Sequence, residues 1–464
     1  MNFIKYSRLF AGILICGSMF ASCAEKFNVG NEVDEEGYLA ATQQVVGIRN
    51  EDGKTLFTTV EIAEDETSVN FYAALSKPAT AATSAVIAVA DASYVEEYNA
   101  KHGTTYLAFP TENVTIGDGN TSIEAGAKKS EAVPVTITAG AGVSADATYM
   151  IPLTVTSNSA TSGKTHYVLV KDYRGRKFVS SEKPSGIKLI SCMEVGQTSP
   201  LFHKSFMLKN SGLPLFDIVI LFSSKIVYDT ELCKLVVQNP VGVDGTLRGG
   251  IVQELHDMGM KVVVSILGSD NAGVAHLTDE ACKTYAQELA NFCEAHDLDG
   301  VFFDDEYTNS WSHPGLTTPS VDRAARLCYE TKMAMPDKLV TCYMWSPTRT
   351  HGFFEEIEGV EPGDFVDYGI NDYGAWLGED RYLGMERSQI APGSANFAEA
   401  YANWCATPGN LERVRNEGYG AYMVYCLTAN QSVYAREIEQ LQNIAQYLYD
   451  DELVDTGYRP ECTW

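Results

Sequence analysis

The chain has 464 residues, enough for two or three domains, and its hydrophobic content of 45% and aromatic content of 11% allow large cores and exclude a disordered protein. Its 61 acidic residues outnumber its 34 basic residues, which gives a net charge of −27. A surface this acidic disfavours nucleic acids and anionic membranes as partners, but it leaves neutral ligands such as sugars open.

Residues 1–22 predict a secretory signal, because a charged start precedes an apolar stretch that is too short to span a membrane. The stretch Phe20-Ala21-Ser22-Cys23 resembles the cleavage box of bacterial lipoproteins. We therefore expect lipidation of Cys23, with residues 23–38 as a tether to the outer membrane. Glu25 favours the cell surface over the periplasmic face, and the alternative is an ordinary signal followed by a chance cysteine.

Residues 39–175 predict an all-β domain of the immunoglobulin-like sandwich type. Short alternating runs rich in Val and Thr recur between turn signals such as Glu51-Asp52-Gly53. These runs predict antiparallel strands over residues 44–48, 56–60, 69–72, 133–137 and 151–155. Residues 93–103 break the pattern and predict a short helix that ends at Gly103. We favour a spacer role for this domain over glycan contact.

Nine of the 11 cysteines lie after residue 190, mostly within apolar runs. Their number is odd and no C-x-x-C spacing occurs, so neither a disulfide framework nor a zinc site is indicated. We expect buried free thiols.

After a linker over residues 176–186, residues 187–464 alternate between strand and helix patterns. The helical pattern is clearest over residues 278–296, where Tyr285, Leu289 and Cys293 recur at helical spacing. The expected strands are Ile187–Met193, Ile218–Phe222, Val262–Leu267, Gly300–Phe303, Leu339–Met344, Phe365–Ile370, Ser394–Phe397 and Gly420–Leu427. Eight such units predict an α/β TIM (β/α)8 barrel. The alternative is a doubly wound sheet, although the chain has no G-x-G-x-x-G motif.

Three consecutive acids, Asp304, Asp305 and Glu306, follow the fourth expected strand. Side chains two positions apart in a strand share a face, roughly 6.6 Å apart, so Asp304 and Glu306 point the same way and Asp305 points away. Two carboxylates in one space repel, and at least one pKa is expected to rise. This arrangement suits an acid catalyst beside an ionised helper, and it falls at the barrel edge where catalysis takes place. The alternative is a solvated acidic loop.

The chain resembles glycoside hydrolase family 18, in its bacterial endo-β-N-acetylglucosaminidase branch of H and F types. The resemblance covers about residues 185–450 and is carried by five strand segments and by Leu298-Asp299-Gly300-Val301-Phe302-Phe303-Asp304-Asp305-Glu306-Tyr307, which is close to the signature DGxDxDxE. It implies retaining hydrolysis without an enzyme nucleophile, in which the 2-acetamido group of the substrate attacks the anomeric carbon. Glu306 would be the general acid and then the base, and Asp304 would orient the acetamide.

The resemblance also implies substrate contacts. Tyr373 corresponds to the tyrosine whose hydroxyl contacts the acetamide oxygen, and Asn371 to its amide partner on the same strand face. Further candidates for substrate binding lie at expected strand ends: Tyr307, Trp311, Trp345, Trp376, Tyr425 and Glu194.

One residue departs from the signature. Phe302 stands where many family members carry an acid that shares a proton with the middle Asp. Asp304 must then be held by other donors, and its desolvation is expected to raise its pKa.

The leading hypothesis is hydrolysis of the β-1,4 bond in the N,N′-diacetylchitobiose core of N-glycans, with mannose-rich glycans expected by analogy to the branch. The alternatives are a chitinase-like hydrolase of GlcNAc polymers and a non-catalytic glycan-binding lipoprotein. We expect no cofactor and no metal, and we expect a monomer whose partners are N-glycans and, through the lipid anchor, a membrane.

Overall fold

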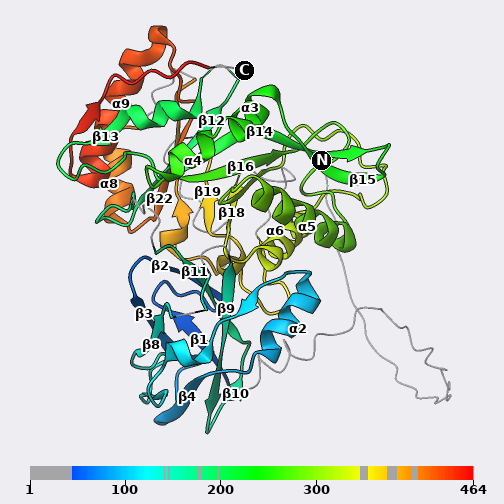
Figure 1. Cartoon of the computed structure of the whole chain (residues 1–464), viewed down its shortest axis with the longest axis vertical. Coiled ribbons are helices and arrows are strands. Elements are labelled where there is room, and N and C mark those ends of the chain that lie inside the picture. Colours follow the sequence, from blue (N-terminus) through cyan, green and yellow to red (C-terminus); the bar gives the residue numbers. More distant parts are fainter. Residues whose placement is uncertain are drawn as a thin grey trace, which may run out of the picture.

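The computed structural model describes residues 44–140, 142–144, 147–174, 180–196, 198–344, 354–373, 384–398, 406–462 and 464. Two parts are visible in Figure 1, a β-rich part in blue and teal and a larger α/β part in green to red. The predicted signal, its tether and Cys23 lie outside the described residues.

The β-rich part consists of two sheets around one apolar core. The first sheet has the order β10 (Thr161–Ser162), β1 (Val45–Asn50), β3 (Glu66–Leu75), β8 (Val133–Thr138), β6 (Val114–Thr115). The second has the order β2 (Phe57–Ile62), β11 (His166–Asp172), β9 (Thr148–Ser157), β4 (Thr83–Val89), β7 (Asn120–Ile123), and β5 (Leu107–Ala108) pairs with β9. Alternate residues of the strands are buried and form the shared core, among them Ile48, Phe71 and Ile151.

The sequence predicted antiparallel strands in this part, but three of its strand pairs are parallel. β1 pairs with β10, β2 with β11, and β5 with β9 in parallel. Parallel neighbours need a long crossover, and the chain between residues 62 and 166 supplies one for β2 and β11. Local alternation cannot reveal such a pairing, because it looks the same in both directions. The helix expected over residues 93–103 is present as α2 (Ser93–His102), and Gly103 ends it in the left-handed conformation.

The α/β part is built on a nearly closed parallel sheet of nine strand segments. Their order is β20 (Ile390–Ala391), β19 (Tyr368–Ile370), β18 (Leu339–Tyr343), β17 (Gly300–Asp304), β16 (Lys261–Leu267), β14 (Ile218–Asp229), β12 (Lys188–Glu194), β22 (Ala421–Tyr425), β21 (Ser394–Asn396). β15 (Lys234–Gln238) extends β14 as an antiparallel hairpin. A parallel bridge between Tyr373 and Ser394 joins the two ends, so the sheet is barrel-like.

Two expected strands differ from the prediction. The sixth is only β19, because Pro362 starts the short helix α7 (Pro362–Phe365) and leaves three residues for the strand. The seventh is present as β21, one residue shorter than expected, and a further short segment, β20, precedes it and is separated from it by Pro392 and Gly393. Proline has no N–H to donate to a sheet, so it interrupts the pairing there.

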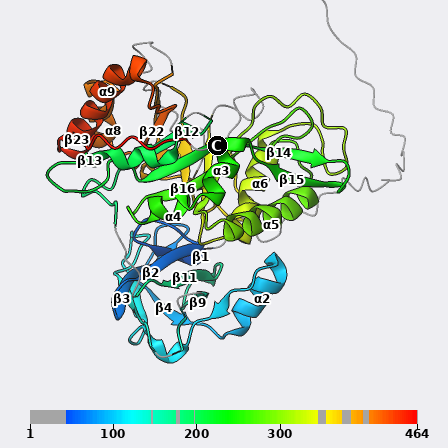
Figure 2. The same ribbon diagram turned by 45° about the horizontal axis from the view of Figure 1, so that its top comes forward.

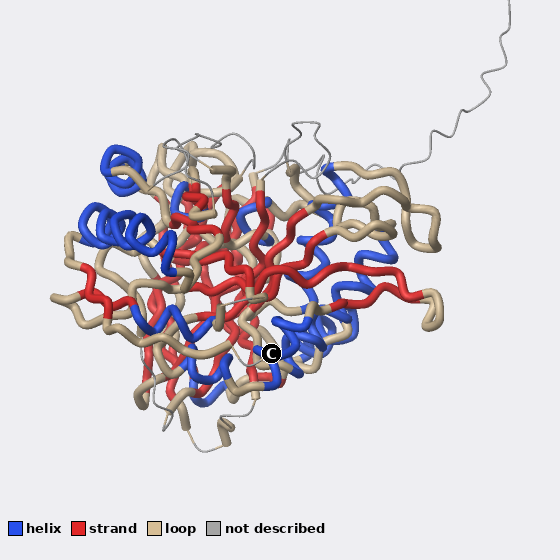
Figure 3. Tube along the Cα trace, turned by 90° about the horizontal axis from the view of Figure 1, so that it is seen from above, coloured by secondary structure: helices blue, strands red, loops and turns tan. Residues whose placement is uncertain are grey.

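Helices surround the central strands when the molecule is seen from above (Figure 3). They are α3 (Val241–Arg248), α4 (Ile251–His256), α5 (Asp279–Ala295), α6 (Val321–Ala334), α8 (Pro408–Asn416) and α9 (Gln431–Tyr449), with short 3-10 helices η1 (Thr111–Asn113), η2 (Pro200–Ser205) and η4 (Arg387–Gln389). The helix expected over residues 278–296 is α5, which Thr278 caps by accepting a hydrogen bond from the Ala281 N–H. The first strand is followed by η2 and by β13 (Phe206–Leu208), which pairs with β23 (Leu453–Asp455).

The strands separate two apolar cores. Ile190, Ile218, Val263, Phe302 and Ile370 are among the side chains that fill the inside of the barrel. A larger cluster lies between the outer face of the strands and the helices. Alternation along each strand therefore decides which side chains face the interior.

The β-rich part packs on the barrel, and its Phe57 and Tyr98 belong to the outer apolar cluster of the barrel. The Tyr98 hydroxyl donates to the Met333 carbonyl over 2.7 Å. Figure 2 shows α2 beneath α5, where Gln287 donates to the His102 carbonyl over 2.8 Å. The β-rich part is therefore in direct contact with the barrel.

Five of the eight described cysteines are buried as free thiols, as predicted, whereas Cys233 is exposed and Cys426 and Cys462 are partly exposed. No helix among the described residues has the length and apolar character needed to cross a membrane.

Candidate active site

The acid run lies at the carboxyl end of β17, in the middle of the sheet. All five residues of β17 are buried, and the strand pairs in parallel with β16 and β18. Phe302 belongs to the cluster inside the barrel and Phe303 to the outer cluster. Strand alternation therefore turns Asp304 toward the interior, as predicted, above Phe302.

Asp304 is a buried carboxyl, with 7% of its surface exposed. Its burial raises its pKa well above the usual range, and the nearby charge of Glu306 raises it further. The expected rise of at least one pKa is confirmed. The proton is thus held more tightly on Asp304 than on an ordinary aspartate.

Asp305 faces away from the interior, also as predicted. Its Oδ1 accepts a hydrogen bond from the Ala275 N–H over 3.1 Å, in the loop that follows β16. Burial raises its pKa to about 7, although hydrogen bonds from the Ala275 and Val274 backbone act against this rise. Asp305 therefore ties the acid run to the neighbouring loop.

The same loop contacts the acid run through the backbone. The Gly268 N–H donates to the Asp304 carbonyl over 3.2 Å, and the Thr308 hydroxyl donates to the Ala272 carbonyl over 3.1 Å. A side chain at Gly268 would place its Cβ 2.1 Å from the Glu306 carbonyl oxygen, so only glycine fits there. The backbone that carries Glu306 is held on one side by this approach.

Two aromatic candidates are exposed beside the acids. Tyr307 is 68% exposed and adopts a positive φ of 65°, and its hydrogen bond to Glu306 raises its pKa. Trp311 is 40% exposed, and its ring centroid lies 5.3 Å from that of His276. Trp345 and Trp376, the other two tryptophan candidates, lie outside the described residues.

Tyr373 and Tyr425 meet at the far side of the barrel mouth, with ring centroids 5.9 Å apart. The Tyr425 hydroxyl donates to Glu194 Oε1 over 2.8 Å, which joins the ends of the eighth and first strands. Burial raises the pKa of Tyr373, and the charges of Asp304 and Glu306 contribute to the rise. These candidates from distant parts of the chain therefore surround one space.

Asn371 and Tyr373, which the sequence predicted to share a strand face, both lie just beyond β19. The Asn371 side chain is buried and donates to the Pro392 carbonyl over 3.3 Å, between β20 and β21. β19 ends at Ile370, so regular alternation stops before both residues.

Sequence reasoning missed Tyr343 and Asp372. The Tyr343 hydroxyl donates to Asp372 Oδ1 over 2.6 Å, and the Tyr343 ring centroid lies 6.3 Å from that of Phe302. Their positions at the ends of the fifth and sixth strands were a signal, because barrel reactions use such residues.

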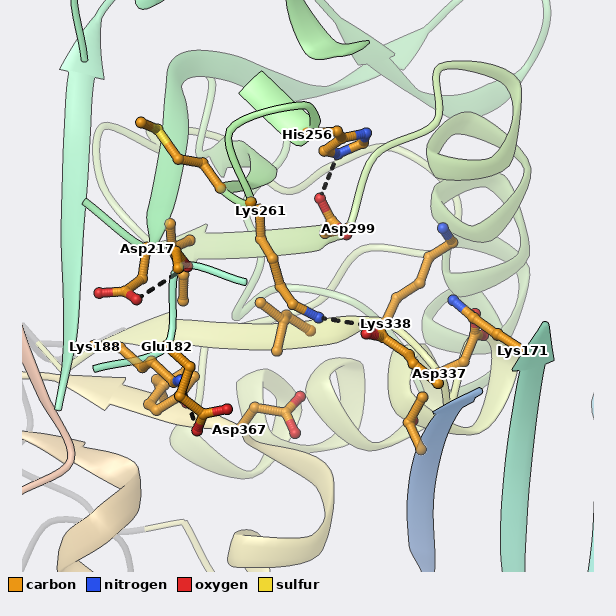
Figure 4. Close-up of a pocket in the computed structure, with 18 of the residues that line it drawn as sticks. Lys171, Glu182, Lys188, Asp217, His256, Lys261, Asp299, Asp337, Lys338 and Asp367 are labelled. Atoms are coloured by element: carbon orange, nitrogen blue, oxygen red, sulfur yellow. Dashed lines mark hydrogen bonds and ion pairs between the residues drawn. The ribbon is translucent and has the colours of Figure 1, made fainter. Parts of the chain in front are cut away.

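A cavity of about 990 Å³ lies at the opposite end of the barrel, between the amino ends of the strands and the β-rich part (Figure 4). Charged pairs line it, including His256 with Asp299 at 2.8 Å and Lys171 with Asp337 at 2.6 Å. Burial opposes the charge of His256, but hydrogen bonds to Asp297 and Asp299 outweigh it and raise its pKa to about 9. These acids and bases are paired with one another and lie away from the carboxyl ends, so this cavity is not the candidate active site.

Within the described ranges, no three or more His, Cys, Asp or Glu side chains are grouped as metal ligands would be.

Comparisons with known proteins identify the family of the chain. The chain is 42% identical over 286 residues to endo-β-N-acetylglucosaminidase F1 of Elizabethkingia meningoseptica, a match that covers 60% of this chain and 83% of that relative. The chain belongs to the endo-β-N-acetylglucosaminidase family. A second endo-β-N-acetylglucosaminidase, from Flavobacterium sp. (strain SK1022), is 26% identical over 247 residues, which cover 52% of this chain and 76% of the relative.

Solved structures extend the similarity to nearly the whole chain. EndoBT-3987 of Bacteroides thetaiotamicron with Man5GlcNAc product matches with a TM-score of 0.78 and 31% identity, covering 90% of this chain and 98% of the other. The same enzyme in complex with Man9GlcNAc2Asn substrate matches with a TM-score of 0.71 and 29% identity over the same shares. A family model described as a "-like, N-terminal domain" matches residues 35–162, a range that overlaps the β-rich part.

Proposed function

We propose that this endo-β-N-acetylglucosaminidase hydrolyses the β-1,4 bond of the N,N′-diacetylchitobiose core of mannose-rich N-glycans. The observation that carries the proposal is the pair of Asp304 and Glu306 at the end of β17, with Asp304 buried inside the barrel mouth. Family membership supports the reaction, and the two structures of EndoBT-3987 with Man5GlcNAc and Man9GlcNAc2Asn support the class of glycan.

The proposed mechanism is substrate-assisted and retaining. Glu306 donates a proton to the glycosidic oxygen, while the acetamide oxygen of the substrate attacks the anomeric carbon and the C–O bond to the departing GlcNAc breaks. The product of this step is an oxazolinium ion. Glu306, now ionised, takes a proton from water as the water oxygen attacks the anomeric carbon. The bond from that carbon to the oxazolinium oxygen breaks, which opens the ring and restores the acetamide.

Asp304 orients the acetamide and balances the positive charge that develops on it. Because burial raises the pKa of Asp304 in the free protein, the arriving positive charge favours its ionisation at the moment when the negative charge is useful. Tyr373 contacts the acetamide oxygen, and Tyr307, Trp311, Tyr425 and Glu194 line the approach of the glycan.

The test compares the wild-type protein with Glu306→Gln on a mannose-rich glycoprotein, with glycan release measured as a gel shift. We expect the wild type to shift the band and Glu306→Gln to be slower by about 10²- to 10⁴-fold, the usual contribution of a general acid. Glu294→Gln, at an exposed position of α5, is the matched control and should leave the rate unchanged.

Two outcomes would overturn the proposal. Degradation of colloidal chitin without any release from the glycoprotein would favour a chitinase-like hydrolase. Retained glycan binding with no cleavage of either substrate would favour a glycan-capture protein.

We further propose that Cys23 carries a lipid anchor and that residues 23–38 tether an immunoglobulin-like domain and a monomeric enzyme to the outer membrane, facing outward. The lipoprotein-type box before Cys23 supports the anchor. Cys23→Ala should move the protein from the membrane fraction to the soluble fraction, and protease added to whole cells should degrade the wild type. Unchanged fractionation would contradict the anchor, and protection from protease would favour the periplasmic face.

A further inference from the structure

The ends of the fifth and sixth barrel strands are joined by a single carboxylate oxygen. Oδ1 of Asp372 accepts the Tyr343 hydroxyl over 2.6 Å and the Tyr373 N–H over 2.7 Å. Tyr343 is the last residue of β18, and Asp372 follows β19 by two positions. The first hydrogen bond fixes the phenol of Tyr343, and the second fixes the backbone that carries the phenol of Tyr373.

Tyr343 lies beside Phe302, the interior residue that departs from the family signature, and Tyr373 lies beside Tyr343. The Tyr343 ring centroid lies 6.3 Å from that of Phe302 and 6.5 Å from that of Tyr373. Phe302 has no polar atom, so Asp304 has no hydrogen-bonding partner two positions before it on its own strand. The polar groups of this wall come from the fifth and sixth strands instead.

Both phenols are near the acid pair and remain protonated. Burial raises the pKa of Tyr343 and of Tyr373, and the charge of Asp304 contributes to both increases. A protonated phenol presents a hydroxyl that donates and also accepts. The Tyr343 hydroxyl already donates to Asp372, so its oxygen is left to accept a hydrogen bond from a group in the pocket.

We propose that Asp372 is a positioning residue for the 2-acetamido group of the substrate. It holds Tyr343 through the phenol and Tyr373 through the backbone, so that the two hydroxyls stand at set places in the wall opposite Asp304. This inference rests on the proposed function, because it assumes that the acetamide reacts. Asp372 itself does not act on the substrate.

The experiment measures kcat, KM and inhibitor affinity for the wild type, Asp372→Ala, Asp372→Asn, Tyr343→Phe and the double variant Asp372→Ala/Tyr343→Phe. The inhibitor is a thiazoline analogue of the cyclised acetamide, in which the fused ring mimics the oxazolinium ion. Asp322→Ala, at an exposed position of α6, is the control.

We expect Asp372→Ala to lower kcat by at least 10-fold and to weaken the analogue by a similar factor, with KM changed less than threefold. Asp372→Asn keeps a carbonyl oxygen that accepts both hydrogen bonds, so it should recover most of the rate. The double variant should be no slower than the worse single variant, because both changes break the same link.

A wild-type rate in Asp372→Ala would overturn the inference. So would a loss that appears equally in kcat, KM and thermal stability and that Asp372→Asn does not recover, since this would indicate a purely structural role. Failure of the proposed function is distinguishable, because the wild type would then release no glycan.

Discussion

Asp304 is buried in the folded protein, where the ionised form of its carboxyl group is disfavoured. Its burial raises its pKa well above the usual range, so between the ordinary pKa of an aspartate and this raised value the native state binds a proton that the unfolded chain releases. Native stability contributed by this group is therefore present at low pH and is lost as pH rises through that window. Such a cost is typical of a residue kept for its chemistry rather than for its contribution to stability.

A substitution of Phe302 tests most directly how the surroundings of Asp304 set its pKa. Phe302→Asp adds a second carboxyl on the same strand face, and its negative charge should raise the pKa of Asp304 further. Activity requires Asp304 to ionise, so the acid limb of the profile of kcat/KM against pH should move to higher pH. The measurement is glycan release from a mannose-rich glycopeptide across the acid and neutral range.

Phe302→Asn is the control, because the asparagine side chain is polar and similar in size to that of aspartate but carries no charge. It should lose stability, since Phe302 is 1% exposed inside the barrel, but its acid limb should not move. An unchanged limb in Phe302→Asp would contradict the electrostatic explanation.

At the scale of elements, the acid run is positioned by its neighbour β16 and the loop after it. Asp305 accepts from Ala275, Thr308 donates to Ala272, and Gly268 donates to the Asp304 carbonyl. These contacts hold the backbone of Glu306 from the side that faces away from the substrate. The positions of Asp304 and Glu306 therefore depend on β16 and the loop after it as well as on β17.

Gly268→Ala tests this arrangement. Its Cβ would lie 2.1 Å from the Glu306 carbonyl oxygen and 2.6 Å from the Thr308 hydroxyl, so the end of β17 must move. A displacement of about 1 Å at a catalytic group costs roughly 100-fold in rate, and we expect kcat to fall by about that factor while the protein stays folded. The measurement is steady-state kinetics with circular dichroism of the same samples.

Gly409→Ala is the matched control, because a Cβ at that position in α8 has no neighbour within 4 Å. It should leave kcat unchanged. A normal rate in Gly268→Ala would mean that the loop after β16 moves to relieve the clash, while Glu306 keeps its position.

At the scale of the whole molecule, the β-rich part is docked firmly on the amino ends of the barrel strands. Asp364 of α7 is 5% exposed, and it accepts hydrogen bonds from the Thr55 N–H at 2.6 Å, the Leu56 N–H at 3.3 Å and the Thr55 hydroxyl. Across the same interface, Lys171 pairs with Asp337 at 2.6 Å. The spacer role expected from the sequence stays a prediction. These contacts favour a fixed base, meaning a β-rich part that is held rigidly against the barrel.

Asp364→Ala should destabilise the protein by about 3 kcal/mol, because it leaves buried backbone donors without a partner. Urea unfolding followed by tyrosine fluorescence measures the change, and Asp322→Ala serves as the exposed control. Activity at low temperature should be unaffected. Two separate unfolding transitions, with the barrel transition unchanged by Asp364→Ala, would contradict a fixed base and favour an independent spacer.

Much of the candidate site followed from local sequence alone. The buried run before Asp304 predicted a central strand, and the period of two then assigned Asp304 and Phe302 to the interior and Asp305 to the exterior. The helix α5 was also predicted from local sequence, because apolar residues recur in it at helical spacing. These features depend only on residues within a few positions of one another.

Only the tertiary structure decided which distant residues meet. Three features join segments that have no local pattern in common. They are the link from Tyr343 through Asp372 to Tyr373, the pairing of β20 with β19 and of β21 with β22, and the docking of Asp364 on Thr55. The shared face expected for Asn371 and Tyr373 stays a prediction, because β19 ends at Ile370, before both residues. The sequence by itself determined the period of each strand and the pair of acids. The closure of the barrel decided what surrounds these acids, because hydrogen bonds between strand ends depend on the register of the whole sheet.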